Sequence, residues 1–296
     1  MKKLKIGYFA DGPWSHLAFR KIISDKSIKI QFIVPRSDTD DFTLKEYARK
    51  FSIDYLVPKN INDQKFIDKI SLYKCDLFVS MSFNQIFKKQ IISLTKEGII
   101  NCHAGKLPYY RGRNVLNWVL INDEKEFGIT VHYVNEGIDT GDIISQKVYP
   151  IDDDTDYKNI LELSYNECAL LLYDSIKKIQ NSNVKRIKQK NNEGFYCGRR
   201  GVGDEIIDWN HSSRRIFNFI RAICIPGPMA TTYINGKEVK INSSRIFDNI
   251  SYIGINGQII KKTMEGFLVK TNDSFIEILE IKTDVKLKVG DRFKNE

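Results

Sequence analysis

Three residues between positions 99 and 143 are of types that stabilise an oxyanion and carry a proton. Asn101 and His103 stand two residues apart, where the apolar run GIINC gives way to polar residues. In an extended chain, side chains two apart point to the same side, so an amide donor and an imidazole would lie together. Asp139 follows in EGIDTGD, whose glycines permit a tight loop. A carboxylate in that loop would orient the imidazole and stabilise its charged form.

The elements that must position these residues follow from hydrophobic patterning. Short apolar runs at 4–10, 28–34, 75–81 and 98–102 predict buried strands. Amphipathic stretches at 15–26, 43–51 and 62–73 predict helices between them, and this alternation predicts an α/β, Rossmann-like domain with a parallel sheet. Ligands of such sheets bind at the carboxyl ends of strands, which is where Asn101 lies. The same patterns predict a helix near 113–121, strands at 128–134 and 143–149, and a long helix at 155–180.

The C-terminal part of the chain differs in composition and in hydrophobic pattern. Residues 179–200 are polar and rich in Asn and Lys, and a helix at 211–224 follows. Asn-Gly pairs at 235–236 and 256–257 indicate hairpins. We therefore predict a catalytic domain at 1–180, a linker at 181–203 and a small, mostly antiparallel, barrel-like β domain at 204–296. Its strands are expected near 229–234, 237–242, 252–256, 258–262, 266–271 and 275–281.

Several function classes are excluded or disfavoured. The first strand is followed by FADGPWSH, which lacks the GxGxxG of a dinucleotide-binding turn, so an ordinary dehydrogenase is not expected. The five cysteines are irregularly spaced and include no CxxC pair, which favours a reducing cytoplasm over disulfides. Cys102 lies beside His103, but further ligands at useful spacing are missing, so no metal is predicted. The lack of an apolar run of about 18 residues predicts no membrane span.

The net charge of +9 permits two explanations. One is a general bias toward Lys, Asn and Ile, and the other is an anionic ligand such as a nucleotide sugar, a folate or RNA. The lysines are spread along the chain, and the densest basic stretch, 177–200, has the composition of a linker. No nucleic-acid partner is expected from this distribution.

By spacing alone, an Asn-x-His pair is more often structural than catalytic, but further elements follow in order. Leu107-Pro108-Tyr109-Tyr110-Arg111-Gly112 comes after the pair, and then Gly128-Ile129-Thr130-Val131-His132 and Asp139-Thr140-Gly141. The segment resembles the formyltransferases that use 10-formyltetrahydrofolate. The resemblance covers about 1–180 and extends more faintly to 204–296.

This resemblance implies that Asn101, His103 and Asp139 are catalytic, with 10-formyltetrahydrofolate as formyl donor and no metal. It places the folate near Met81, Ser82 and Phe83 and against the 135–142 loop, with Gly137 and Asp142. For Phe83, simple core packing is the alternative. His132, which lies mid-strand among apolar residues, is interpreted as mainly structural. A homodimer is a further implication.

The acceptor amine is indicated by two places where this sequence differs from the methionyl-tRNA formyltransferases. Arg111-Gly112-Arg113-Asn114 and the opening FADGPWSH resemble enzymes that formylate 4-amino-4,6-dideoxysugars carried on UDP or dTDP for surface polysaccharides. The stretch 35–51 is short and acidic in its middle, whereas methionyl-tRNA formyltransferases usually carry a basic insertion there. We expect Arg111, Arg113 and Asn114 to contact the nucleotide sugar. Methionyl-tRNA formylation and hydrolysis of formyl-folate are the alternatives.

Overall fold

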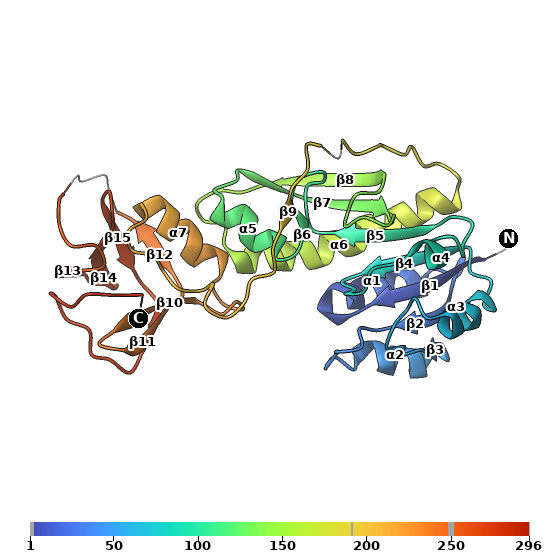
Figure 1. Ribbon diagram of the computed structural model, residues 1–296, viewed down its shortest axis with the longest axis horizontal. Coiled ribbons are helices and arrows are strands. Elements are labelled where there is room, and N and C mark those ends of the chain that lie inside the picture. Colours follow the sequence, from blue (N-terminus) through green and yellow to red (C-terminus); the bar gives the residue numbers. More distant parts are fainter. Residues whose placement is uncertain (1–2, 191, 248–251, 296) are drawn as a thin grey trace. The chain divides into compact units, whose positions relative to one another are not determined.

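The computed structural model describes residues 3–190, 192–247 and 252–295 (Figure 1). Two compact units emerge from the contacts within the chain. The first unit comprises residues 1–112, 127–149 and 162–197, and the second comprises 113–126, 150–161 and 198–296. Two segments from earlier in the chain, 113–126 and 150–161, thus group with the C-terminal residues. The domain limits at 180 and 203 remain a sequence prediction.

The first unit is built on a seven-stranded sheet of order β3-β2-β1-β4-β5-β7-β8. Neighbouring strands from β3 to β5 are parallel, and β7 runs antiparallel to β5. The predicted Rossmann-like α/β class is confirmed, with one strand reversed. The strands are β1 Leu4–Ala10, β2 Ile28–Val34, β3 Asp54–Tyr55, β4 Leu77–Met81, β5 Ile99–His103, β7 Glu126–Tyr133 and β8 Ile143–Pro150.

Helices connect these strands close to where the periodicity predicts them. The predicted ones of the first half are α1 Gly12–Ser24, α2 Thr43–Phe51 and α3 Gln64–Ser71, whereas the short α4, Lys89–Ile92, was not predicted. The long helix α6, Tyr157–Gln180, begins in the second unit and continues into the first. In the described ranges, no helix combines the length and the apolar character that crossing a bilayer needs.

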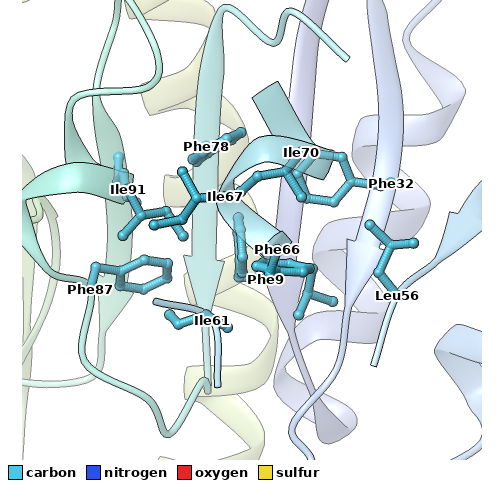
Figure 2. Close-up of a cluster of buried hydrophobic side chains, with 12 residues drawn as sticks. Phe9, Phe32, Leu56, Ile61, Phe66, Ile67, Ile70, Phe78, Phe87 and Ile91 are labelled. Atoms are coloured by element: carbon cyan, nitrogen blue, oxygen red, sulfur yellow. The ribbon is translucent and has the colours of Figure 1, made fainter. Parts of the chain in front are cut away.

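A cluster of buried aromatic and aliphatic side chains covers one face of the sheet (Figure 2). The Phe9 ring on β1 lies edge-on to Phe32, Phe78 and Phe87, with ring centroids 5.7, 5.3 and 5.2 Å away. Each of these rings loses its water shell and gains edge-to-face contacts, which together stabilise the sheet. The cluster also includes Ile67 and Ile70 from α3. The cluster thereby holds β1, β2, β4 and β5 together through Phe9, Phe32, Phe78 and Ile99.

The second unit contains helices α5 (Val115–Ile121) and α7 (Ser213–Ala222) and two antiparallel sheets. The Asn235–Gly236 turn joins two paired strands, and both of its residues have positive φ, as a tight two-residue hairpin requires. The expected strand at 252–256 is not formed over its described residues, and β12, at Ser244–Ile246, was not predicted. The sheets have the orders β10-β11-β16 and β12-β15-β14-β13, with β10 Ala230–Ile234, β11 Lys237–Ile241, β13 Ile259–Lys262, β14 Phe267–Lys270, β15 Phe275–Ile278 and β16 Ile281–Lys282.

Candidate active site

The reversal between β5 and β7 brings four polar residues onto one face of the sheet. In this antiparallel pair, Asn101 stands opposite His132 and His103 stands opposite Thr130. Directly opposed residues have their side chains on the same face, about 5 Å apart. The Asn101 side-chain nitrogen lies 3.3 Å from His132 Nε2. The Thr130 hydroxyl donates to the Gly105 carbonyl at 2.7 Å and so fixes the loop that leaves His103.

The loop after β7 carries Asp139 to these residues. Its ends are closed by a hydrogen bond from Tyr133 N to the Asp142 carbonyl, 2.9 Å long. At Gly141, a Cβ atom would lie 1.8 Å from the Tyr133 carbonyl oxygen, so a side chain is excluded there. Asp139 itself has φ of 53°, in the left-handed region. The result is an Asp139 Oδ2 atom 3.6 Å from His103 Nδ1. The three residues singled out as catalytic are therefore neighbours.

Asp139 is a buried carboxylate with several partners. Its Oδ2 accepts a hydrogen bond from Gly112 N at 2.9 Å, and its Oδ1 lies 3.4 Å from His132 Nε2. Burial raises the pKa of Asp139, but the charge on His103, the hydrogen bond and charge of His132, and the Gly112 N–H outweigh burial and lower the pKa well below its usual range. The group is ionised at neutral pH as a result.

His103 has an acceptor at each ring nitrogen. Its Nε2 lies 2.7 Å from the Tyr110 carbonyl oxygen, and its Nδ1 faces Asp139. The Tyr110 carbonyl can only accept, so Nε2 carries a hydrogen, and the 3.6 Å from Nδ1 to Asp139 Oδ2 is an ion-pair distance, longer than a hydrogen bond. The His103 side chain is 8% exposed. It is suited to stabilising a developing negative charge and to moving a proton.

Comparison with known proteins agrees with this arrangement. The chain matches the Formyl transferase family over residues 23–168 and the Formyl transferase, C-terminal domain, over residues 202–292. It belongs to the formyl transferase family. A methionyl-tRNA formyltransferase of Syntrophomonas wolfei is 33% identical over 239 residues, which is 80% of this chain and 76% of that protein. The resemblance inferred from the motifs is thus confirmed, and the protein is a formyl-transferring enzyme.

Two solved structures share the fold. One is WlaRD, a sugar 3N-formyl transferase, with a TM-score of 0.67 and 23% identity, covering 97% of this chain and 100% of that chain. The other is an N-formyltransferase from Helicobacter canadensis, also with a TM-score of 0.67 and 23% identity, covering 95% and 100%. At this identity the likeness establishes the fold of the formyltransferase.

The predicted folate-contacting residues lie at the end of β4 and in the Asp139 loop. Met81 is buried and pairs with Cys102 on β5, so the end of β4 lies next to the strand that carries Asn101 and His103. Ser82 has φ of 53° and is half-buried. The Phe83 ring packs against Phe9 with centroids 5.7 Å apart, as the core-packing alternative expected.

The other two predicted folate residues belong to the Asp139 loop. Gly137 donates its N–H to the Asn135 side chain, and a Cβ atom on it would lie 2.2 Å from the Thr140 hydroxyl. Asp142 is half-buried and closes the loop through its main chain. Both residues therefore shape the loop that carries the carboxylate.

Arg111 is placed differently from the two other predicted substrate residues of the formyltransferase. It is 2% exposed, its guanidinium donates to the Gln189 side chain at 2.8 Å, and it lies over the Tyr196 ring. Gln189 in turn donates to the carbonyls of Asp139 and Gly141, at 2.9 and 2.6 Å. Arg111 thus supports the Asp139 loop through Gln189.

Arg113 and Asn114 are exposed. Asn114 has φ of 53°, and its side-chain oxygen accepts a hydrogen bond from Arg200 N at 3.0 Å. An exposed guanidinium can meet a phosphate without losing a buried partner. Arg113 is therefore better placed than Arg111 for that role.

The sequence interpretation missed two contributors to the formyltransferase site. Gln189 sits in a stretch whose composition is that of a linker, and nothing in the local pattern distinguishes it. His132 did leave a signal, because Thr130-x-His132 repeats the spacing of Asn101-x-His103. The register of β5 and β7 places these two pairs opposite each other.

The second unit has a hollow of about 240 Å³ that includes none of the predicted site residues. The walls of the hollow are Trp118, Ile121, Arg200, Asp204, Ile206, Ile207, Asp208, His211, Arg215, Ile216 and Phe219.

Across the described ranges, no group of three or more His, Cys, Asp or Glu side chains is arranged to hold a metal ion.

Proposed function

We propose that this formyltransferase moves the formyl group of 10-formyltetrahydrofolate to the amine of a UDP- or dTDP-linked 4-amino-4,6-dideoxysugar. The observation that carries the proposal is the grouping of Asn101, His103 and Asp139 at the carboxyl end of β5. An amide donor, a protonated imidazole and an orienting carboxylate are the parts that acyl transfer to an amine needs.

The proposed mechanism is direct attack of the amine on the formyl carbon. A bond forms from the amine nitrogen to this carbon, and the formyl oxygen becomes an oxyanion, which Asn101 and His103 stabilise. The bond from the carbon to the folate N10 then breaks. The proton lost by the amine passes to N10 by way of His103 or a water molecule, while Asp139 keeps the imidazole in place.

The acceptor class is supported by the loop between β2 and α2. Its acidic side chains are paired locally: Asp38 with Arg36 at 3.0 Å, and Asp41 with His16 at 3.0 Å. Residues 35–42 carry three aspartates and one arginine, and this acidic balance offers no cationic clamp for the phosphates of a tRNA. WlaRD was solved in the presence of dTDP and 5-N-formyl-THF, and the Helicobacter canadensis enzyme in complex with folinic acid and dTDP-3-aminofucose. Since the first is a sugar 3N-formyl transferase and the second holds a 3-amino sugar, the acceptors to be tested include 3-amino as well as 4-amino sugars.

Methionyl-tRNA formylation is the second candidate. Its support is the 33% identity to methionyl-tRNA formyltransferases from two bacteria, over 80% and 85% of this chain. Hydrolysis of formyl-folate is a third outcome that the same site chemistry permits. The site of action is proposed to be the cytoplasm, and the product a precursor of surface polysaccharide.

The deciding experiment is absorbance-monitored release of tetrahydrofolate from 10-formyltetrahydrofolate. The panel contains UDP- and dTDP-linked 3- and 4-aminosugars, methionyl-tRNA and uncharged tRNA, and a mixture without acceptor. Turnover that requires one aminosugar supports the proposal. Turnover with methionyl-tRNA alone overturns the acceptor class, and release without acceptor identifies a hydrolase. Light scattering on the same preparation tests the proposed homodimer.

A further inference from the structure

His132 makes contacts that its position in the middle of a buried strand does not explain. It lies between Val131 and Tyr133 on β7 and is 2% exposed. Its Nδ1 atom is 2.8 Å from the Tyr133 carbonyl oxygen, which can only accept. Nδ1 therefore carries a hydrogen and donates it. This bond fixes the rotation of the ring and leaves Nε2 as the nitrogen that faces the site.

That single nitrogen reaches two of the proposed catalytic residues. It lies 3.4 Å from Asp139 Oδ1 and 3.3 Å from the Asn101 side-chain nitrogen. The other carboxylate oxygen, Oδ2, faces His103 Nδ1 and accepts from Gly112 N. Each oxygen of Asp139 thus has its own imidazole. With a hydrogen on Nε2, His132 would hold Oδ1 as Gly112 N holds Oδ2, and the carboxylate could not rotate away from His103.

The state of His132 Nε2 also determines how the Asn101 carboxamide is turned. With a lone pair on Nε2, one Asn101 N–H points to it and only the second is free for an oxyanion. With a hydrogen on Nε2, donated to Asp139, the amide oxygen of Asn101 turns toward His132 and both N–H hydrogens are released. The ring therefore sets the number of donors that Asn101 can offer to the reaction.

We propose that His132 is a positioning residue for formyl transfer, holding Asp139 and Asn101 in the geometry that the reaction needs. The proposal rests on the catalytic roles proposed above for these two residues. His132 acts through them and does not touch the reacting atoms. The competing explanation is that His132 is a buried histidine whose two nitrogens are merely satisfied. Its removal would then cost stability and leave the rate of the folded enzyme unchanged.

The first test does not depend on activity. The chain has 4 histidines, so the ring spectrum of protein labelled with ¹⁵N-histidine can be assigned by single substitutions. We expect a protonated Nδ1 on His132. We also expect Asp139→Asn to shift the ring nitrogens of both His103 and His132, with those of His211 unchanged. An unprotonated Nδ1, or His132 signals that Asp139→Asn does not move, would overturn the proposal.

The second test is kinetic and uses His132→Phe and His132→Gln. Phenylalanine keeps the ring volume without hydrogen bonds, whereas the glutamine amide can reach the position of Nε2. We expect His132→Phe to lower kcat about 30- to 100-fold with the KM for the formyl donor within about threefold. His132→Gln should recover to within about tenfold of wild type. Ser175→Ala is the matched control, because it removes another buried hydrogen bond of the first unit, to Leu171 O at 2.7 Å.

The outcomes separate the explanations. A folded His132→Phe enzyme with wild-type kcat would identify His132 as a structural residue only. If His132→Phe does not fold, His132→Asn replaces it, because the shorter amide reaches the Nδ1 position instead of Nε2. Glutamine should then exceed asparagine in kcat by about tenfold, and equal rates would overturn the proposal. A wild-type enzyme with no turnover on any acceptor defeats the proposed function alone, since the spectrum still tests the geometry.

Discussion

Two histidine–aspartate pairs in this formyltransferase have the same separation and very different surroundings. His103 Nδ1 and Asp139 Oδ2 are 3.6 Å apart in the first unit, and His211 Nε2 and Asp208 Oδ2 are 3.6 Å apart in the second. The side chains of the first pair are 8% and 13% exposed, and those of the second 35% and 41%. Distance alone does not distinguish a site from an ordinary surface ion pair.

The distinguishing feature is what else holds each carboxylate. Asp139 also has Gly112 N and His132 as partners, and its loop is supported by Gln189. Asp208 also accepts from Asn210 on its own turn, a contact within two residues. An exposed pair of this kind contributes about 0–1 kcal/mol, whereas unpairing a buried charge costs several.

The largest effect is expected from variants that break the buried pair of His103 and Asp139. His103→Ala and Asp139→Asn should each lower kcat by at least about 100-fold, because an oxyanion donor or the group that orients it is lost. The matched controls are His211→Ala and Asp208→Asn, which break a pair of the same length and should leave kcat within about twofold. Steady-state rates and thermal melts on all four proteins make the comparison. Near wild-type rates for either site variant, in a folded protein, would contradict the assignment.

A second variant disturbs the buried pair without replacing either of its residues. At Gly105, a Cβ atom would lie 2.3 Å from His103 Nε2 and 2.5 Å from the Tyr110 carbonyl oxygen. Gly105→Ala must therefore displace the imidazole, and a displacement near 1 Å costs roughly 30- to 100-fold in kcat. Gly198→Ala is the control, since nothing lies within 4 Å of the added atom there. Equal kcat values for the two variants would show that the His103 position is not critical.

The elements that sequence predicts well are those whose determinants are local. The runs 4–10 and 28–34 have the bounds of β1 and β2, and the stretch 43–51 has those of α2, because apolar periodicity and length decide them. The Asn235–Gly236 hairpin follows from φ preferences alone. The strand expected at 252–256 is not formed. In that sheet, β12 is the strand that pairs with β15 instead.

For the site, the residue types and spacings around Asn101 were visible, but their partners were not. That β7 runs antiparallel to β5 is a property of the whole sheet, and it is this reversal that places His132 opposite Asn101. Gln189 reaches the Asp139 loop over a separation of 50 residues. From the sequence, Arg111 was expected to contact the nucleotide sugar, but its side chain is buried in the fold. Contacts between distant segments decide each of these three cases.

A smaller effect separates the two arginines of the RGR segment. We expect Arg113→Ala to weaken nucleotide-sugar binding about tenfold, since an exposed guanidinium on a phosphate contributes a charge-assisted hydrogen bond. Arg111→Ala should chiefly lower the thermal midpoint, because it removes a buried guanidinium and unpairs the partly buried Gln189 oxygen. Calorimetric titration with the nucleotide sugar and thermal melts on both variants test this. The reverse pattern would mean that Arg111 leaves its buried position to bind phosphate.

The smallest effect concerns the surface ion pairs of the second unit and how they respond to acid. Arg214 donates to Asp123 and to Asp153, and the hydrogen bonds from Arg214 outweigh burial and lower the pKa of Asp123 to about 2. Because this folded-state pKa lies below the ordinary value of 3.8, the stabilisation is complete above about pH 4 and is lost as the pH falls toward 2. Asp123→Asn should therefore reduce the acid sensitivity of unfolding.

The expected change is under about 1 kcal/mol, since Asp123 is 36% exposed and solvent screens the pair. A larger change is expected at Asp139, because its pKa is lowered further and its charge is buried between two imidazoles. Urea unfolding of wild type and Asp123→Asn at pH 7 and pH 3 measures this change, and Asp139→Asn at pH 7 gives the cost of losing the buried charge. If Asp123→Asn lowers the free energy of unfolding at pH 7 as much as Asp139→Asn does, burial is not what separates the two regions, and the contrast between the buried and the exposed histidine pairs loses its physical basis.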